Sequence, residues 1–270
     1  MFRYEYYLRN KHFPHIWCTG CGCGIILKSL LRAIDRSALS KDEIALISGI
    51  GCSSRTPGYV DFNTLHTTHG RALAFATGLK LAKPDLKVIV VSGDGDATAI
   101  GGNHFIHTAR RNIDITAIIY NNHIYGMTGG QASPTTPLGK RGSTAPYGSI
   151  EPDFDISGLA IAAGASFVAR STCYHAVQLD KFIEKGLSKK GFSLIEVLSP
   201  CPTYYSRPNR LGTAVDMMRW YKENSIPFAR AKDMSAEERR DKVITGILHD
   251  IERPEFCEEY KRLTERVKGT

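Results

Sequence analysis

The chain has 270 residues, of which 42% are hydrophobic and 23% are charged, and its formal net charge is +8. These proportions are ordinary for a folded globular protein and exclude an intrinsically disordered chain. No run of about 18 apolar residues occurs and residues 1–7 lack the apolar segment of a signal peptide, so we expect a cytoplasmic protein that does not enter a membrane.

Five short apolar runs, rich in β-branched residues, predict buried β-strands. They cover residues 44–48, 87–92, 115–120, 166–169 and 193–198. The hydrophobic periodicity between them predicts helices over residues 24–34, 70–82, 99–110, 156–163 and 175–187. Strands that alternate with helices indicate an α/β fold, in which helices cover both faces of a parallel sheet.

The alternation ends near Pro202, so we expect one domain over residues 1–201 and a C-terminal arm with surface helices over residues 202–270. The arm carries many of the basic residues, but acidic residues are interleaved with them, as in the segment 237–242. Mixed charge is typical of a solvated helix face rather than of a surface that follows phosphates. No aromatic residues alternate with the basic ones as a platform for single strands requires, which argues against nucleic-acid binding.

Glycine, acidic, amide and thiol residues follow four of the predicted strands, at the point where sheets of this kind bind ligands. The segments are Gly49-Ile50-Gly51-Cys52-Ser53, Gly93-Asp94-Gly95-Asp96, Asn121-Asn122-His123-Ile124-Tyr125-Gly126 and Ser199-Pro200-Cys201-Pro202. Because the carboxyl ends of parallel strands share one edge of the sheet, we expect these segments to lie close together.

Asp94 and Asn122 offer the hard oxygen ligands that suit Mg²⁺, and the helix and strand between them bring both to the same edge. The backbone amides of Gly95 and Asp96, at the start of a helix, can face the oxygens of a phosphate. The loop that follows, residues 125–135, has the glycine and threonine content that suits a diphosphate-wrapping loop. Each segment alone is also typical of an ordinary turn or surface loop, and the combination favours a metal and diphosphate site.

The seven cysteines indicate metal ligands or buried thiols rather than disulfides, since their number is odd and the expected compartment is reducing. Cys18 and Cys21 form a C-x-x-C pair, which fits a redox dithiol, half of a zinc site or half of an iron–sulfur site. Cys52 and Cys201, at strand ends, complete a set of four, for which ligand type leaves zinc and iron–sulfur both open. Three thiols have no such placement: Cys23, Cys173 and Cys257. Of these, Cys23 is an alternative ligand to Cys21.

Seven motifs occur in order between residues 17 and 202. They are Trp-Cys-x-Gly-Cys-Gly, Gly-Ile-Gly-Cys-Ser, Thr-x-His-Gly-Arg-Ala, Gly-Asp-Gly-Asp, Tyr-Asn-Asn, Tyr-Gly-Met-Thr-Gly-Gly-Gln and Ser-Pro-Cys-Pro. The spacing from Gly-Asp-Gly to Asn-Asn resembles the thiamine-diphosphate signature. The whole set resembles the β subunit of 2-oxoacid:ferredoxin oxidoreductases, closest to the bacterial 2-oxoglutarate types. Two positions depart from the family pattern: Thr19 replaces a usual proline, and Gly129 stands where some broad-specificity members carry lysine.

This resemblance implies three sets of site residues. It implies that Mg²⁺ is held by Asp94, Asn122 and the carbonyl group of Ile124, and that a [4Fe–4S] cluster is held by Cys18, Cys21, Cys52 and Cys201. It implies contacts with thiamine diphosphate from Ile50, Gly51, Cys52, Ser53, His69, Gly95, Asp96, Gly126, Met127, Thr128, Gly129, Gly130 and Gln131. Among these, His69 is the candidate catalytic residue. Beside such a cofactor a cluster is favoured over zinc, because zinc has no redox states with which to accept electrons.

The implied reaction is the oxidative decarboxylation of a 2-oxoacid, with 2-oxoglutarate favoured, to acyl-coenzyme A and carbon dioxide. Electrons would pass through the cluster to ferredoxin. Thiamine catalysis also needs a glutamate on a pyrimidine-binding domain, which we expect on an α subunit in an αβ or (αβ)₂ assembly. Two alternatives remain at this point: a subunit of a non-redox thiamine-diphosphate decarboxylase or synthase, and a zinc-stabilised nucleic-acid-binding protein.

Overall fold

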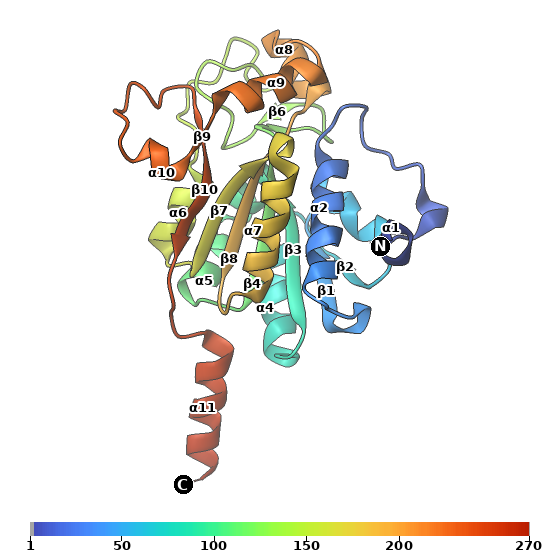
Figure 1. The fold of residues 1–270 in the computed structure, drawn as a ribbon, viewed down its shortest axis with the longest axis vertical. Helices are drawn as coiled ribbons and strands as arrows, with labels where there is room; N and C mark the ends of the chain where they lie inside the picture. Colours follow the sequence, from blue (N-terminus) through green and yellow to red (C-terminus); the bar gives the residue numbers. More distant parts are fainter. Residues whose placement is uncertain (1–2, 270) are drawn as a thin grey trace.

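One eight-stranded sheet organises residues 3–269, the part of the chain that the computed structural model describes (Figure 1). The strands lie in the order β2-β1-β3-β4-β8-β7-β10-β9. Neighbouring strands are parallel, except that β10 runs antiparallel to β7. Their bounds are Ile44–Ser48 (β1), Asn63–His66 (β2), Lys87–Gly93 (β3), Ile115–Asn121 (β4), Phe167–Thr172 (β7), Ser193–Leu198 (β8), Ser225–Pro227 (β9) and Val243–Asp250 (β10).

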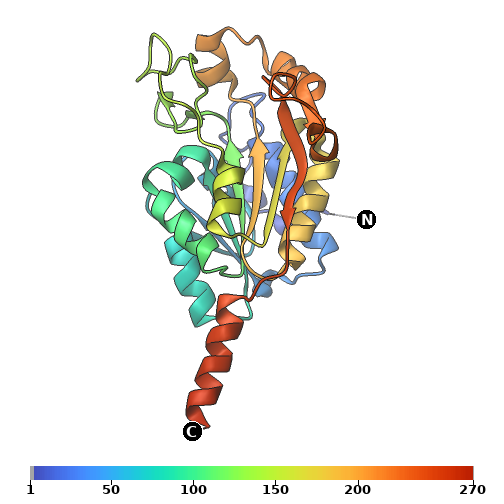
Figure 2. The ribbon, with the colours of Figure 1, turned by 90° about the vertical axis from the view of Figure 1, so that its left-hand side faces the viewer.

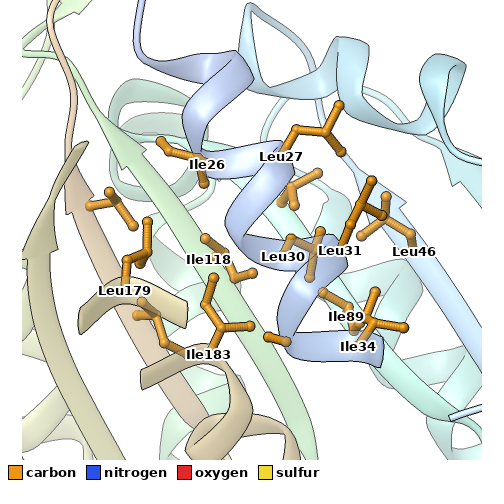
Figure 3. Packing of buried hydrophobic residues seen from close by; sticks show 14 of the residues in the cluster. Ile26, Leu27, Leu30, Leu31, Ile34, Leu46, Ile89, Ile118, Leu179 and Ile183 are labelled. Carbon is orange, nitrogen blue, oxygen red and sulfur yellow. The ribbon is translucent and has the colours of Figure 1, made fainter. Parts of the chain in front are cut away.

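Helices cover both faces of this sheet, which confirms the predicted α/β architecture. Helices α2 (Cys23–Arg36) and α7 (Ala176–Ser188) pack on one face, and Figure 3 shows their side chains meeting around Ile118 of β4. The other face is covered by α4 (Ala72–Ala82), α5 (Gly102–Arg110) and α6 (Ile156–Ala163). Alternate residues of each central strand enter the two hydrophobic clusters, as the pleat of a strand requires.

The C-terminal segment differs from the prediction, because it supplies strands as well as an arm and helices. Strand β10 extends the sheet beside β7, although most of its residues are only partly buried. Its backbone is interrupted by Gly246 with a φ of 135° and by a register shift between Ile247 and His249. An irregular, partly exposed strand lacks the continuous apolar run that marks a buried parallel strand. The mostly exposed edge strand β2 was not predicted for the same reason.

The remaining elements are short or peripheral. A two-stranded hairpin of β5 (Ile124–Tyr125) and β6 (Gln131–Ala132) follows β4. The other α-helices are α1 (Tyr4–Tyr7), α3 (Thr56–Tyr59), α8 (Arg207–Asn209), α9 (Ala214–Asn224), α10 (Phe228–Ala231) and α11 (Phe256–Lys268). Helix α11 extends away from the sheet at the end opposite the hairpin (Figures 1 and 2). Across residues 3–269, no helix has the length and apolar character needed to cross a membrane.

Candidate active site

A pocket of about 440 Å³ opens at the carboxyl edge of the parallel strands, walled by the segments that follow β1, β3 and β4. Most of the predicted site residues line it: Ile50, Gly51, Cys52, Ser53, His69, Asp94, Gly95, Asp96, Asn122, Ile124, Gly126, Met127, Thr128 and Gln131. Gly129 and Gly130 do not line this pocket and lie in the hairpin turn, where both have positive φ. Tyr125, the first residue of the predicted diphosphate-wrapping loop, also lines the pocket, as do three residues that were not among the predicted cofactor contacts: Cys23, Tyr120 and Ser199.

Three oxygen atoms converge on one side of this pocket. The side-chain oxygen of Asn122 lies 3.2 Å from Oδ1 of Asp94 and 2.7 Å from the carbonyl oxygen of Ile124. Octahedral Mg²⁺ binds oxygens at about 2.1 Å, which places adjacent ligand atoms about 3 Å apart. Without a cation, the amide would turn over so that its NH₂ group donates to both oxygens. With its oxygen on this side, the Asn122 amide joins Asp94 and the Ile124 carbonyl group in a set of oxygen donors that suits Mg²⁺.

Asp94 is almost completely buried beside this group. Burial raises the pKa of Asp94, and hydrogen bonds from Ser133 and Thr135 oppose that shift. A buried carboxylate with two hydroxyl donors is suited to meet a cation, because the donors and the cation all stabilise its charged form.

Asp96 uses its whole carboxylate on protein donors. Its Oδ1 accepts hydrogen bonds from Nδ1 of His69 (2.7 Å) and from the backbone amides of Gly70 (2.7 Å) and Ile50 (3.2 Å). Its Oδ2 accepts one from the hydroxyl of Ser92 at 2.5 Å. This carboxylate therefore ties the segments after β1, β2 and β3 together, and only the backbone amide of Asp96 is left to face a cofactor.

The donors in the pocket suit an anionic ligand. Nδ1 of His69 donates to Asp96, which fixes the orientation of the imidazole ring at the edge of the pocket. The hydroxyl of Ser53 is buried, borders the pocket and has no hydrogen-bond partner among the described residues. Gly95 lies against the ring of Tyr125, where a Cβ atom would come within 2.3 Å of a ring carbon. Because Gly95 has no side chain, its backbone can border the pocket without a clash with Tyr125.

The four predicted cluster ligands lie at the same edge of the sheet. A Cβ atom on Gly126 would lie 3.5 Å from Sγ of Cys52 and 3.6 Å from Sγ of Cys201. Burial, and then the nearby thiols of Cys21, Cys201 and Cys18, raise the pKa of the Cys52 thiol to about 12. The indole of Trp17 donates to the carbonyl group of Cys52 at 2.7 Å, which ties the C-x-x-C segment to the end of β1.

Cys23 lies next to Cys21 but in a different environment. It is buried as the first residue of α2, and its thiol forms a hydrogen bond that lowers the pKa of Cys21 to about 7. Cys173, which sequence reasoning left out, is also buried here, with its sulfur 3.6 Å from the carbonyl oxygen of Gly22. Cys257 lies at the start of α11, in a different part of the chain. A hydrogen bond therefore joins the two thiols, of which Cys21 is the less buried.

Within residues 3–269, no three histidine, cysteine, aspartate or glutamate side chains converge closely enough to share one metal ion. A mononuclear zinc site requires such convergence, because all four ligands bind the same atom at about 2.3 Å. In a [4Fe–4S] cluster each thiolate binds a different iron, so its ligands are spread around the cluster.

Comparisons with known proteins identify the family. Residues 49–197 match the model of the thiamine pyrophosphate enzyme C-terminal TPP binding domain. The chain is 56% identical to the 2-oxoglutarate synthase subunit KorB of Methanocaldococcus jannaschii over 97% of both chains. It is 42% identical to the 2-oxoacid:ferredoxin oxidoreductase subunit beta of Saccharolobus solfataricus, over 87% of this chain and 77% of that one.

A solved structure agrees with these matches. The 2-oxoglutarate:ferredoxin oxidoreductase from Magnetococcus marinus superimposes with a TM-score of 0.88 and 34% identity, covering 100% of this chain and 92% of that chain. These comparisons confirm the predicted family and the thiamine-diphosphate-binding fold, and they give no support to the two alternatives. The chain belongs to the β subunits of the 2-oxoacid:ferredoxin oxidoreductases, which are thiamine-diphosphate-dependent enzymes.

Proposed function

We propose that this subunit binds thiamine diphosphate through Mg²⁺ and carries a [4Fe–4S] cluster beside it, for the coenzyme A-dependent oxidative decarboxylation of 2-oxoglutarate. The observation that carries the proposal is the position of Gly126. Within 4 Å of a Cβ atom placed there lie the sulfurs of Cys52 and Cys201 and the side-chain amide of Asn122. The proposed cofactor site and the proposed cluster site would thus share one wall, which suits the passage of electrons from the cofactor to the cluster.

Bound thiamine diphosphate supplies the nucleophilic carbon for attack on a 2-oxoacid, and the cluster accepts electrons singly. In the proposal, Asp94, Asn122 and the Ile124 carbonyl group hold the Mg²⁺ that neutralises the diphosphate. The unpartnered hydroxyl of Ser53 and the backbone amides of Gly95 and Asp96 donate to the cofactor. The remaining contacts come from Ile50, Gly51, Cys52 and the segment Gly126–Gln131, with His69 as the catalytic candidate whose ring Asp96 orients. Cys18, Cys21, Cys52 and Cys201 ligate the cluster.

The proposed substrate and electron carrier rest on the relatives. Several similar chains bear the name 2-oxoglutarate synthase subunit, and the similar Magnetococcus enzyme was solved with 2-oxoglutarate, coenzyme A and succinyl-CoA bound. Ferredoxin stands in the names of the Saccharolobus and Magnetococcus proteins. No lysine or arginine is among the residues that line the pocket of the described chain. We therefore assign recognition of the far carboxylate of 2-oxoglutarate to the α subunit.

The α subunit is also the proposed source of the glutamate that activates the cofactor. The carboxylates that line the pocket of the described chain are Asp94 and Asp96, and both already have the roles given above. Glu43 precedes β1 at the opposite edge of the sheet and caps the backbone of Ser40. Glu151 is exposed in the loop between β6 and α6. The proposed assembly is an αβ or (αβ)₂ complex in the cytoplasm.

Anaerobic purification of the complex tests the proposal. We expect a brown protein that contains about four iron atoms and one thiamine diphosphate per β subunit, as one [4Fe–4S] cluster requires. We also expect it to reduce ferredoxin when 2-oxoglutarate and coenzyme A are both present, with pyruvate as the comparison substrate. A colourless zinc protein would contradict the cluster. Carbon dioxide release without ferredoxin reduction would support a non-redox thiamine enzyme instead.

A further inference from the structure

The two carboxylate oxygens of Asp94 have different surroundings. Oδ1 faces Asn122 in the group of three oxygens at the proposed magnesium site. Oδ2 accepts hydrogen bonds from the hydroxyls of Ser133 at 2.6 Å and Thr135 at 2.5 Å. Both donors are buried, with Ser133 7% exposed and Thr135 1% exposed, so water does not readily replace either hydroxyl.

Ser133 and Thr135 belong to a segment that is tied back to the end of β4. The backbone amide of Ser133 donates to the hydroxyl of Thr136 at 2.8 Å, and that hydroxyl donates to the carbonyl group of His123 at 2.6 Å. Nδ1 of His123 lies 2.8 Å from the carbonyl oxygen of Thr135. The segment 133–136 is therefore anchored at His123, between two of the proposed metal ligands, while its hydroxyls reach across to the end of β3.

The hydroxyl of Thr135 has one proton and, besides the hydroxyl oxygen of Ser133 at 3.1 Å, two acceptors within reach. Oδ2 of Asp94 lies 2.5 Å away and Oδ1 of Asn121 lies 3.0 Å away. A carboxylate is the stronger acceptor, and the amide oxygen of Asn121 already accepts a bond from the backbone amide of His123 at 3.2 Å. Thr135 therefore donates to Asp94, as Ser133 does.

We propose that Ser133 and Thr135 are positioning residues for the magnesium site. By occupying Oδ2 of Asp94 they turn Oδ1 toward the cation, and they hold the ends of β3 and β4 at the spacing that the three oxygens require. The inference rests on the proposed function, because it assumes that Mg²⁺ binds at Asp94. Mg²⁺ demands near-ideal octahedral geometry, so a carboxylate that is free to rotate is a poorer ligand than a fixed one.

Thr135→Val removes the hydroxyl and keeps the shape of the side chain. In the assembled complex with the α subunit, we expect the Mg²⁺ concentration that gives half-maximal retention of thiamine diphosphate to rise about 10–100-fold. Titration with Mg²⁺, followed by measurement of protein-bound cofactor after ultrafiltration, reads this without turnover. Iron content should stay at the wild-type level, and Thr135→Ser should restore the wild-type Mg²⁺ requirement. Ser133→Ala provides an independent variant with the same expected shift.

Thr116→Val is the matched control. Thr116 is buried near the opposite end of β4, and its hydroxyl donates to the carbonyl group of Gly186 at 3.0 Å. The same substitution there removes one buried hydrogen bond without touching Asp94, so the Mg²⁺ requirement should not change. A wild-type Mg²⁺ requirement in both Thr135→Val and Ser133→Ala, or an equal rise in Thr116→Val, overturns the positioning role. If wild-type protein itself retains no thiamine diphosphate with Mg²⁺, the proposed function fails together with this inference.

Discussion

Two aspartates that line the pocket, two residues apart in the sequence, have different hydrogen-bonding partners. Asp94 presents one oxygen to the group formed with Asn122 and Ile124, whereas Asp96 has both oxygens occupied by donors of the protein. A change at Asp94 should therefore affect the bound metal, and a change at Asp96 should first loosen the segments that it ties together.

Asp94→Ala should abolish Mg²⁺-dependent retention of thiamine diphosphate and leave the cluster largely intact. It removes one of three proposed protein ligands, while the cysteines stand on other segments. We expect the loss to exceed about 100-fold, the upper end of what loss of an outer-shell partner causes. Bound cofactor and iron per chain are the two measurements. Asp85→Ala, an exposed aspartate just before β3, is the control, and wild-type cofactor affinity in Asp94→Ala would show the metal assignment to be wrong.

Cys52→Ser and Cys201→Ser should each lose iron and ferredoxin reduction, because hydroxyls are poor replacements for the thiolates that hold iron–sulfur clusters. Cys173→Ser and Cys257→Ser should keep their iron. Iron content and the visible absorption of anaerobically purified complexes decide the matter. Full iron in Cys201→Ser would indicate that the fourth cluster ligand is Cys23, the nearby thiol that forms a hydrogen bond with Cys21.

The placement of Asp94, Asn122, Cys52 and Cys201 at one edge could be predicted, because each directly follows a strand and parallel strands end together. The roles of Ser133 and Thr135 could not be predicted. They lie in a coil with no periodicity, and their contacts with Asp94 depend on how the loop folds back on β4. The role of Asp96 could not be predicted either, because its hydrogen-bond donors come from three separate segments.

At the scale of elements, the five buried strands could be predicted from composition, but the strands that complete the sheet could not. Strand β10 has a glycine with positive φ and a register shift, and it is preceded by a charged loop. Its position depends on the free edge of β7, which is a tertiary feature rather than a local one. The C-terminal segment therefore contributes to the sheet, while α11 beyond it extends away from the body.

Glu255→Ala should destabilise the junction between α5, β4 and α11. The buried Glu255 carboxylate accepts hydrogen bonds from the backbone amides of Asp114, Cys257 and Glu258. Loss of this cap and of the Asp114 partner should lower the free energy of unfolding by about 2 kcal/mol, as measured by denaturant titration.

Glu258→Ala is the control for this change. Glu258 lies in the first turn of the same helix and forms an exposed ion pair with Lys190 at 3.2 Å. Exposed pairs contribute less than about 1 kcal/mol, so this variant should remain close to wild-type stability. Equal losses in the two variants would mean that helix composition, not the cap, determines the effect.

At the scale of the whole molecule, the isolated chain should show no turnover with thiamine diphosphate, Mg²⁺, 2-oxoglutarate, coenzyme A and ferredoxin. The proposed activating glutamate is absent from the described pocket lining. The loop between β6 and α6, near the carboxyl edge (Figure 1), also exposes Leu138, Tyr147 and Ile150. Addition of the α subunit should restore ferredoxin reduction. Robust turnover by the chain alone would require a self-sufficient enzyme and contradict the shared site.

The bare backbone at Gly126 has a kinetic consequence. If this position sets the gap between the centre where carbon dioxide is released and the centre that collects electrons, a side chain there would act as a spacer. In a single turnover, Gly126→Val should then slow ferredoxin reduction more than carbon dioxide release, so that the two products no longer appear together. Simultaneous measurement of both products would show whether this glycine keeps decarboxylation and electron transfer in step.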